Sequence, residues 1–276
     1  MKQSSLLLFI LCSIFHLSKA QNTYLKDNAV NIEKLNVLSD QVYTMLSTNR
    51  IIMVGEQHGT NEPVKFVTGL AEVFANHGDS VQVGFEIPPK EMEEYLKHHT
   101  ENSITQSKFF TESTDGRGSL AWAGAIAQLS KNPRITIFFY DINTGELGNR
   151  DSLMYVNIKN NLMKHPARKI ITIGGNIHNR MVPYKGKNTV ASYLLRDTQL
   201  NLTEKFSSLD HYYLEGSERN NIGNGLELRT ISNPPSAYSS LGYENYVVPM
   251  HSPDYPYSGM LYTKHVTAAE MMKPTK

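Results

Sequence analysis

Beyond residue 12 this chain has no cysteine. Its 276 residues include one, Cys12, which lies in an apolar N-terminal stretch. The rest of the chain therefore has no disulfide bond, no thiolate metal site and no cysteine nucleophile. The folded part must be stable by core packing, and a chain of this length is long enough to bury a sizeable core.

A surplus of charge of one sign is also missing. The 27 lysine and arginine residues nearly balance the 26 aspartate and glutamate residues, and no basic stripe occurs along the sequence. Nucleic acids and anionic membrane surfaces are therefore not the partners that this composition predicts. After residue 20 no apolar run is long enough to cross a bilayer, so we expect no transmembrane segment there.

The N-terminus has the order of a secretory signal peptide. Lys2 precedes an uncharged apolar run at residues 6–15, and Ser18 and Ala20 then place small residues before a cleavage site at Gln21. The run is about half of the ~20 residues that a spanning helix needs, so cleavage is favoured over a membrane anchor.

Two segments follow from this interpretation. We predict a signal peptide at residues 1–20 and a single α/β domain at residues 21–276. The mature protein is then exported to the periplasm or to the outside of the cell. Its oligomeric state is not predicted by the sequence.

Four short runs rich in β-branched and aromatic residues predict buried strands, because strands of parallel sheets have continuous apolar sequences. These runs are residues 50–54, 81–85, 135–140 and 169–173. Apolar residues at helical spacing predict helices between them, at residues 62–76, 120–129 and 152–163. The alternation predicts an α/β fold with a mainly parallel sheet sandwiched by helices.

The remaining sequence has weaker patterns. Residues 211–214, 246–250 and 259–263 are less convincing strands, and residues 35–46 predict a leading helix. Residues 216–245 are rich in glycine, asparagine, serine and proline, which predicts long loops.

Each of the four clear strands is followed by an acidic or a histidine side chain. In chain order these are Glu56 with His58, then Glu86, Asp141 and His178. Ligands bind outside the carboxyl ends of the strands in open parallel sheets. We therefore expect His58 and His178 to share one cleft with Glu86, and we interpret Asp141 as a turn or cap residue.

An apolar strand followed by Gly-x-x-His occurs twice, at residues 55–58 and 175–178. A duplication that left two related halves and a chance similarity both account for this pair. In either case, equivalent strand ends carry an imidazole.

Imidazole and carboxylate together support two routes to hydrolysis. A neutral histidine can take a proton from water while a carboxylate fixes its tautomer. Alternatively, His58, Glu86 and His178 can bind a divalent metal that lowers the pKa of a bound water. The sequence has no Gly-x-Ser-x-Gly motif, so a serine esterase of the usual sort is not indicated.

The ordered set of motifs resembles a known superfamily. GEQHGTNEP, GFEIP, DGRGS with an apolar helix after it, and GGNIHNR occur in this order within residues 48–180. Together they resemble the superfamily of erythromycin esterases, ChaN-type haem-uptake proteins and Tiki/TraB proteins, with a looser similarity toward the C-terminus. The resemblance implies an EreA/ChaN-like fold and a catalytic or binding role for Glu56, His58, Glu86 and His178. It also implies that Arg117 of DGRGS contacts a substrate anion or oxyanion.

The resemblance covers several chemistries, including metal-dependent proteases, metal-independent esterases and haem binders. We predict hydrolysis of an ester or amide in a small molecule or peptide. In this prediction His58 is the general base or a metal ligand, Glu56 or Glu86 orients it, and His178 is the second base or ligand.

Two alternatives stay open. One is a haem- or metal-binding uptake protein of the cell envelope without turnover, in which one of the six tyrosines between Tyr238 and Tyr262 binds haem iron. The other is a catalytically inert descendant of an enzyme.

Overall fold

The structure is a computed structural model that describes residues 21–142, 149–221, 223, 225–252 and 254–272. The predicted signal peptide, with Cys12, lies outside the described residues. Within the described part of the chain, no helix has the length and apolar character needed to cross a membrane.

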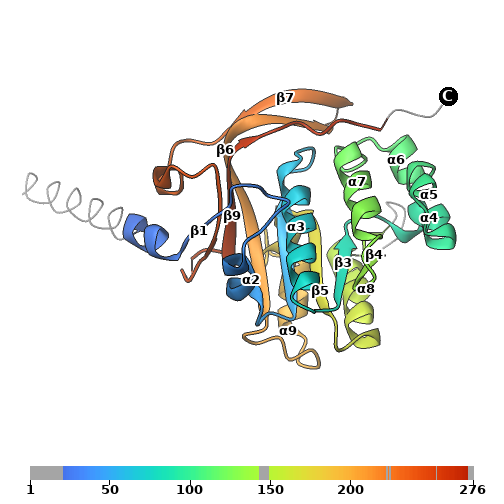
Figure 1. The fold of residues 1–276 in the computed structure, drawn as a ribbon, viewed down its shortest axis with the longest axis horizontal. Helices are drawn as coiled ribbons and strands as arrows, with labels where there is room; N and C mark the ends of the chain where they lie inside the picture. The colour runs from blue at the N-terminus through green and yellow to red at the C-terminus, as the bar shows by residue number, and fades with distance from the viewer. Residues whose placement is uncertain (1–20, 143–148, 222, 224, 253, 273–276) are drawn as a thin grey trace, which may run out of the picture.

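In the described residues nine strands form one mixed sheet, in which the central strands are parallel (Figure 1). The order is β1-β8-β9-β6-β2-β5-β3-β4, and β7 pairs with β6. The strands are β1 Val30–Asn31, β2 Ile51–Glu56, β3 Val81–Phe85, β4 Ile135–Phe139, β5 Lys169–Gly175, β6 Phe206–Asn221, β7 Leu226–Ser232, β8 Asn245–Pro249 and β9 Gly259–Val266. The α/β fold predicted from the sequence is confirmed.

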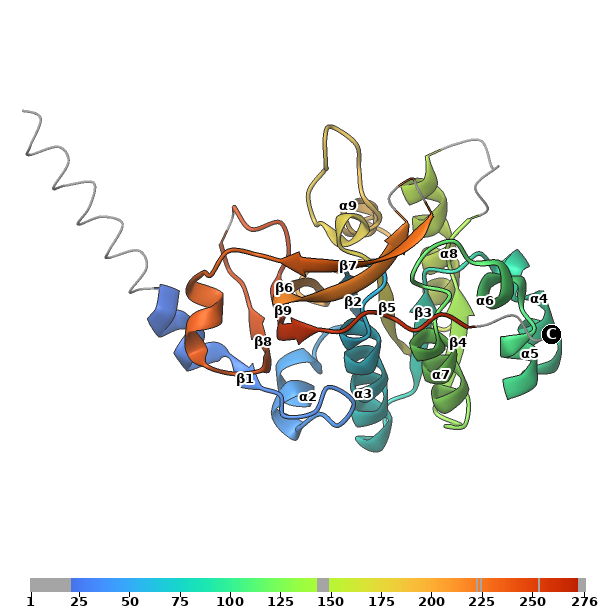
Figure 2. The ribbon, with the colours of Figure 1, turned by 90° about the horizontal axis from the view of Figure 1, so that it is seen from above.

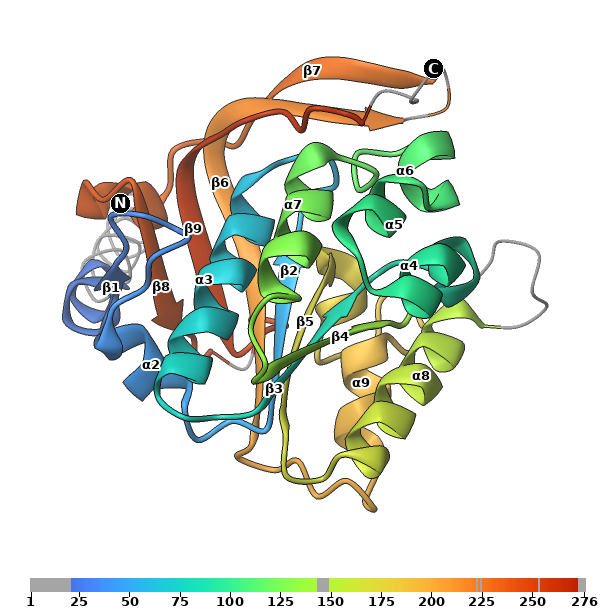
Figure 3. The ribbon, with the colours of Figure 1, turned by 45° about the vertical axis from the view of Figure 1, so that its right-hand side comes forward.

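Helices cover both faces of the sheet. The α-helices are α2 Asp40–Leu46, α3 Glu62–Asn76, α4 Glu93–His98, α5 Glu101–Thr105, α6 Lys108–Glu112, α7 Leu120–Leu129, α8 Arg150–Lys164 and α9 Val190–Arg196. Residues 21–28 are also helical. The described residues contain three short 3-10 helices, η1 Pro89–Met92, η2 Asn176–Asn179 and η3 Ala237–Leu241. Helices α2, α3 and α7 lie on one face, and α8 and α9 lie on the other (Figure 3).

The central strands have continuous apolar sequences because they are buried from both sides. Every residue of β2 and β3 is buried. One cluster, with Phe74 and Trp122, fills the space under α3 and α7. A second, with Met154 and Leu194, fills the space under α8 and α9. Burial of these large side chains is the main force holding the layers together.

Strand β6 has sixteen residues and is longer than its neighbours β2 and β9. Its last residues extend past the carboxyl ends of these strands and pair with β7, from Glu215↔Ser232 to Asn221↔Leu226. We call residues 215–232 the β6–β7 arm. Figures 1 and 2 show this arm lying across the carboxyl-end edge of the sheet.

The predicted loops at residues 216–245 are therefore wrong in part, since they contain the end of β6, strand β7 and η3. The arm is one hairpin with mostly polar, partly exposed side chains, so its sequence lacks the apolar run that marks a buried strand. The predicted leading helix at residues 35–46 is too long. Helix α2 begins at Asp40, because Ser39 takes the extended N-cap conformation.

Candidate active site

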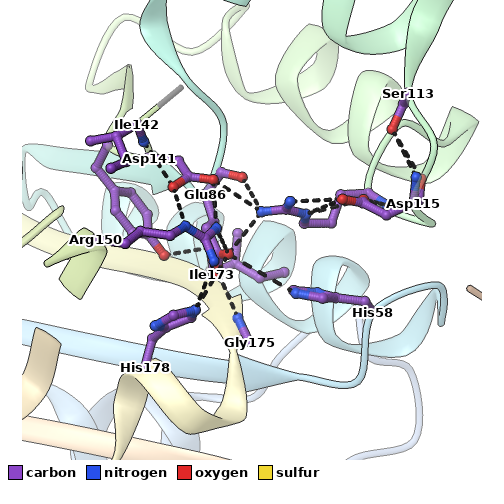
Figure 4. A network of polar contacts seen from close by, with 12 residues as sticks. His58, Glu86, Ser113, Asp115, Asp141, Ile142, Arg150, Ile173, Gly175 and His178 are labelled. Carbon is purple, nitrogen blue, oxygen red and sulfur yellow. Dashed lines mark hydrogen bonds and ion pairs between the residues drawn. The ribbon is translucent and has the colours of Figure 1, made fainter. Parts of the chain in front are cut away.

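The site lies at the carboxyl ends of β2, β3 and β5, where neighbouring parallel strands open toward solvent. Glu56 is the last residue of β2, Glu86 directly follows β3, and His178 lies in η2 after β5. His58 lies in the turn between β2 and α3. The structure brings these four predicted residues together, as Figure 4 shows for the three that it labels.

Glu86 is the centre of the site. Its side chain is fully buried, and its Oε1 accepts hydrogen bonds from Arg117 Nη1 at 2.8 Å and Arg150 Nη2 at 2.7 Å. Its Oε2 accepts from the Gly175 backbone N–H at 2.7 Å. Burial raises the pKa of Glu86, but the Arg117 guanidinium and the other nearby cationic groups lower it by more, to well below its usual range. Glu86 is therefore a permanent carboxylate.

Two histidine–carboxylate pairs face this carboxylate. His58 Nδ1 lies 2.6 Å from Glu56 Oε1, and His178 Nδ1 is hydrogen-bonded to Asp151 Oδ1. The Nε2 atoms of His58 and His178 lie 4.0 Å and 3.8 Å from the same oxygen, Glu86 Oε1. A carboxylate on Nδ1 fixes the tautomer and leaves Nε2 for chemistry.

Glycine at position 175 makes room for both rings. A Cβ built on Gly175 would lie 3.2 Å from His58 Cε1 and 3.5 Å from His178 Cδ2. A side chain here would therefore push between the two imidazoles. Gly174, one residue earlier, is equally confined, because a Cβ there would collide with Glu86 and with the Tyr140 hydroxyl.

Of the two carboxylates that orient the histidines, Glu56 is the more buried. Glu56 is 2% exposed, and its Oε2 has no hydrogen-bond partner among the described residues. Burial raises the pKa of Glu56. Burial lowers the pKa of His58, but the adjacent Glu56 carboxylate raises it by more, so the net pKa of His58 is above its ordinary value.

The His178 imidazole is held from a second side. Arg150 Nη1 lies 3.3 Å from His178 Nε2, so neutral His178 accepts a hydrogen bond from this guanidinium. Burial and Arg150 lower the pKa of His178, whereas Glu86 and Asp151 raise it, and the net pKa is raised. In contrast, His58 Nε2 lies 4.0 Å from Glu86 Oε1, which is beyond hydrogen-bond distance.

Arg117 and Arg150 differ in the freedom of their donors. Arg117 is buried, with Nε and Nη2 bonded to Asp115 and Nη1 bonded to Glu86 and Asp141. It therefore fixes the DGRGS loop and the charge of Glu86. The Arg150 side chain is 40% exposed. The sequence predicted the substrate contact for Arg117, but the geometry makes Arg150 the more accessible guanidinium.

Asp141 connects the two guanidinium groups. Its Oδ1 accepts from Arg150 Nε at 2.9 Å and from the Ile142 backbone at 2.8 Å, and its Oδ2 accepts from Arg150 Nη2 at 2.7 Å and Arg117 Nη1 at 3.3 Å. The bond to Ile142 is local, and no described helix begins there, so the interpretation of Asp141 as a turn or cap residue does not cover its main contacts. The same carboxylate contacts both guanidinium groups that bond Glu86, and Figure 4 shows it beside Arg150.

Sequence reasoning missed Arg150 and Asp151. Both lie in the first turn of α8, which begins on the carboxyl-end side of the sheet after β4. The signal was available, because a helix that follows a parallel strand starts at the edge where ligands bind. Asn149 caps this helix through its side chain, which fixes the position of the two residues.

A cleft of about 410 Å³ adjoins the guanidinium side of the site. Its lining residues are Pro88, Glu91, Lys108, Phe109, Glu112, Ser113, Thr114, Asp115, Arg117, Asp141, Ile142 and Arg150. A substrate in this cleft would reach the exposed end of Arg150 next to His178.

The donor set does not suit a divalent metal. His58, Glu86 and His178 were the predicted ligands, but both oxygens of Glu86 already accept hydrogen bonds. Two guanidinium groups occupy the positions where a cation would sit, and they would repel it. In the described residues, no group of three or more histidine, cysteine, aspartate or glutamate residues has the arrangement of a metal site.

The tyrosines considered for haem lie in and around strands β8 and β9. Tyr246 and Tyr262 are buried and stacked on each other, and the hydroxyls of Tyr255 and Tyr257 bond to Asp210 and to the Asn176 carbonyl. A cavity of about 570 Å³ lies nearby. Its lining residues are Gln21, Tyr24, Tyr238, Met250, His251, Ser252, Asp254 and Tyr255, among which tyrosine, methionine and histidine are side chains that ligate haem iron.

No family model and no curated protein matches this chain. Solved structures do share its fold. A Bacillus cereus protein aligns with a TM-score of 0.71 and 10% identity over 92% of this chain and 99% of its own. A succinoglycan biosynthesis protein aligns with a TM-score of 0.66 and 9% identity over 94% of this chain and 99% of its own. An erythromycin esterase variant in its open conformation aligns with a TM-score of 0.56 and 9% identity over 84% of this chain and 95% of its own.

At these identities the similarity establishes the fold. The chain has the mixed, mostly parallel α/β sheet of the EreA/ChaN-like structures, as its motifs predicted.

Proposed function

We propose that this protein is an exported hydrolase that cleaves an ester with His58 as general base, without a metal ion. One observation carries the proposal: the His58–Glu56 pair at 2.6 Å leaves Nε2 unbonded beside the permanent carboxylate of Glu86. A base needs this arrangement, with one nitrogen oriented and the other available.

In the proposed reaction, His58 Nε2 takes a proton from water, and the water oxygen bonds to the ester carbonyl carbon. Glu56 stabilises the imidazolium that forms, because its Oε1 accepts the Nδ1 proton. The carbon–oxygen bond to the alcohol then breaks, and protonated His178 gives its Nε2 proton to the leaving oxygen. Glu86 lies about equally far from both Nε2 atoms and stabilises either imidazolium.

Arg150 is the proposed contact for the carbonyl oxygen. Its Nη1 bonds neutral His178, but a protonated His178 has no lone pair at Nε2 and releases that end of the guanidinium. The freed donor then stabilises the negative charge on the carbonyl oxygen. Arg117 keeps Glu86 and Asp115 in place during this step.

Haem binding without turnover is the second candidate. It is supported by the separate cavity lined by Tyr238, Met250 and His251, which is large and contains side chains suited to haem iron. This function would leave the His58–Glu86 site unused.

The test is a screen of wild type and His58→Ala against aryl, alkyl and lactone esters and simple amides. Parallel samples are dialysed against a chelator or titrated with haem. We expect ester turnover that survives chelation and falls at least about a hundredfold in His58→Ala. Turnover abolished by chelation would refute the metal-free mechanism. No turnover, together with stoichiometric haem binding that Tyr238→Phe or His251→Ala weakens, would favour the second candidate.

A further inference from the structure

The β6–β7 arm reaches the catalytic turn through one polar contact. Gln57, which lies between Glu56 and His58, donates from Nε2 to Glu218 Oε2 at 2.6 Å. Glu218 belongs to β6, 161 residues further along the chain. We propose that Glu218 is a positioning residue for His58, acting through Gln57; this inference rests on the proposed function.

Glu218 is placed for this role at an energetic cost. It is 2% exposed, and its other oxygen accepts from Arg229 Nη1 of β7 at 3.2 Å. A buried carboxylate is unfavourable unless it is paired and hydrogen-bonded. Here both oxygens are used, one within the arm and one on the catalytic turn. Although β7 of the arm is mostly exposed, the buried carboxylate of Glu218 bonds Gln57, the residue next to His58.

The backbone of the turn is held by the same arm. The Arg219 N–H donates to the Gly59 carbonyl at 3.0 Å, and the Ala269 N–H donates to the same oxygen at 2.8 Å. Gly59 has φ of +86°, and a Cβ there would collide with the Arg219 carbonyl. Only glycine fits this turn at low cost.

The loop that carries Arg117 packs at the junction where the turn of Gly59 meets the arm at Arg219. A Cβ on Gly116 would collide with Gly59 Cα and the Arg219 carbonyl, so the two loops and the arm are in direct backbone contact. After β9, residues 267–272 run across the starts of α3 and α7, which closes the junction from the other side (Figure 2). The arm therefore fixes His58 relative to the Arg117–Glu86 pair.

His178 provides an internal reference for this inference. Its ring is held by Asp151 and Arg150, both on α8, and among the described residues its polar side-chain contacts do not include the arm. Loosening the arm contact is expected to move His58 relative to Glu56 while His178 keeps its surroundings.

The experiment is a pH titration of both imidazoles by NMR in wild type, Gln57→Leu and Glu218→Leu, which needs no substrate. We expect the His58 pKa to fall toward its ordinary value of about 6.5 as the Glu56 contact loosens. The His178 pKa stays at its wild-type value. Glu218→Gln, which keeps an oxygen acceptor for Gln57, restores most of the His58 shift. Glu227→Gln, an exposed change on the same arm, has no effect.

Turnover gives the second readout. With an ester substrate, kcat falls about tenfold in Gln57→Leu and Glu218→Leu while KM stays near wild type, because orientation of the base is affected and not substrate contact. If either leucine variant does not fold, the same titration is made with Gln57→Asn, whose side chain is one methylene too short to keep the contact with Glu218.

A lowered melting temperature with His58 titrating as in wild type would overturn the inference, since the arm would then be merely structural. An equal shift of His58 and His178 would also overturn it. Failure of the hydrolase proposal is recognised separately, because it removes turnover but leaves the titration intact.

Discussion

The two histidines of the site resemble each other in sequence and differ in their surroundings. Both follow Gly-x-x at the end of a parallel strand, and both have Nε2 about 4 Å from Glu86 Oε1. His58 is oriented by a fully buried carboxylate, Glu56, from its own strand end. His178 is oriented by the partly exposed Asp151 from the first turn of α8.

In the proposed function, this difference in contacts assigns the base to His58. His58 Nε2 has no hydrogen bond in the described structure that would have to break before it accepts a proton. His178 Nε2 accepts from Arg150 and must exchange that contact first. In the proposed function the two similar motifs have separate roles because the carboxylate that orients His58 comes from its own strand end, whereas the carboxylate that orients His178 comes from α8.

The largest expected effect compares the two rings directly. His58→Ala removes the base and lowers kcat by about a thousandfold, within the range of general-base catalysis, or ~4 kcal/mol of transition-state stabilisation. His178→Ala lowers kcat by only about tenfold to a hundredfold, because water can supply the leaving proton. Steady-state kinetics on the best ester from the screen measures both. His98→Ala, a change on the exposed helix α4, is the control and keeps wild-type activity. Equal losses in the two active-site variants would contradict the assignment.

Removing the shared carboxylate is expected to affect the whole site. Glu86→Gln leaves Arg117 and Arg150 facing a neutral amide, and breaking a buried ion pair from one side costs about 3 kcal/mol or more of folding free energy. Denaturant unfolding followed by fluorescence measures the loss. Glu112→Gln, an exposed position in the same cleft, should change stability by less than about 0.5 kcal/mol. A Glu86→Gln protein as stable as wild type would show that this charge does not organise the site.

A smaller effect separates the two rings through Arg150. The Arg150 guanidinium lowers the pKa of His178, so Arg150→Ala should raise that pKa further. His58 has no contact with Arg150 and should shift by less. Arg150→Lys keeps the charge and should lie between wild type and Arg150→Ala. NMR titration of both rings measures the shifts, and a larger shift at His58 would be inconsistent with the assigned contacts.

Much of this fold and site could be predicted from the sequence, because both depend on buried strands and their ends. The apolar runs that gave β2 and β3 also located Glu56 and Glu86, since side chains at strand ends of a parallel sheet share one edge. His58 and His178 followed from the same reasoning.

The residues that were missed have a common physical reason. Asp151 is an acidic residue in the first turn of a helix, where such residues usually serve only the helix terminus. Arg150 is a cation at the same terminus, and its partners Glu86 and Asp141 lie outside the helix. Glu218 lies in a polar hairpin, whose strand pairing depends on a distant segment and not on local apolar pattern. Arg117 lies two residues from Asp115, so that pair is a local alternative to substrate contact that the sequence itself offers. Its contacts with Glu86 and Asp141 could not be predicted, because both carboxylates are distant in sequence.

The most direct test of the account compares two titrations in one buffer. A base must be unprotonated, so kcat/KM should rise with pH through the pKa of His58 and fall again at higher pH, as His178 loses the proton that it gives to the leaving oxygen. Because the pKa of His58 is raised, the midpoint of the rising limb should lie above about 6.5. NMR gives the His58 pKa of the same free enzyme. The account predicts that the kinetic and the NMR midpoints coincide. A kcat/KM that stays flat while His58 titrates, or that follows His178 instead, would contradict it.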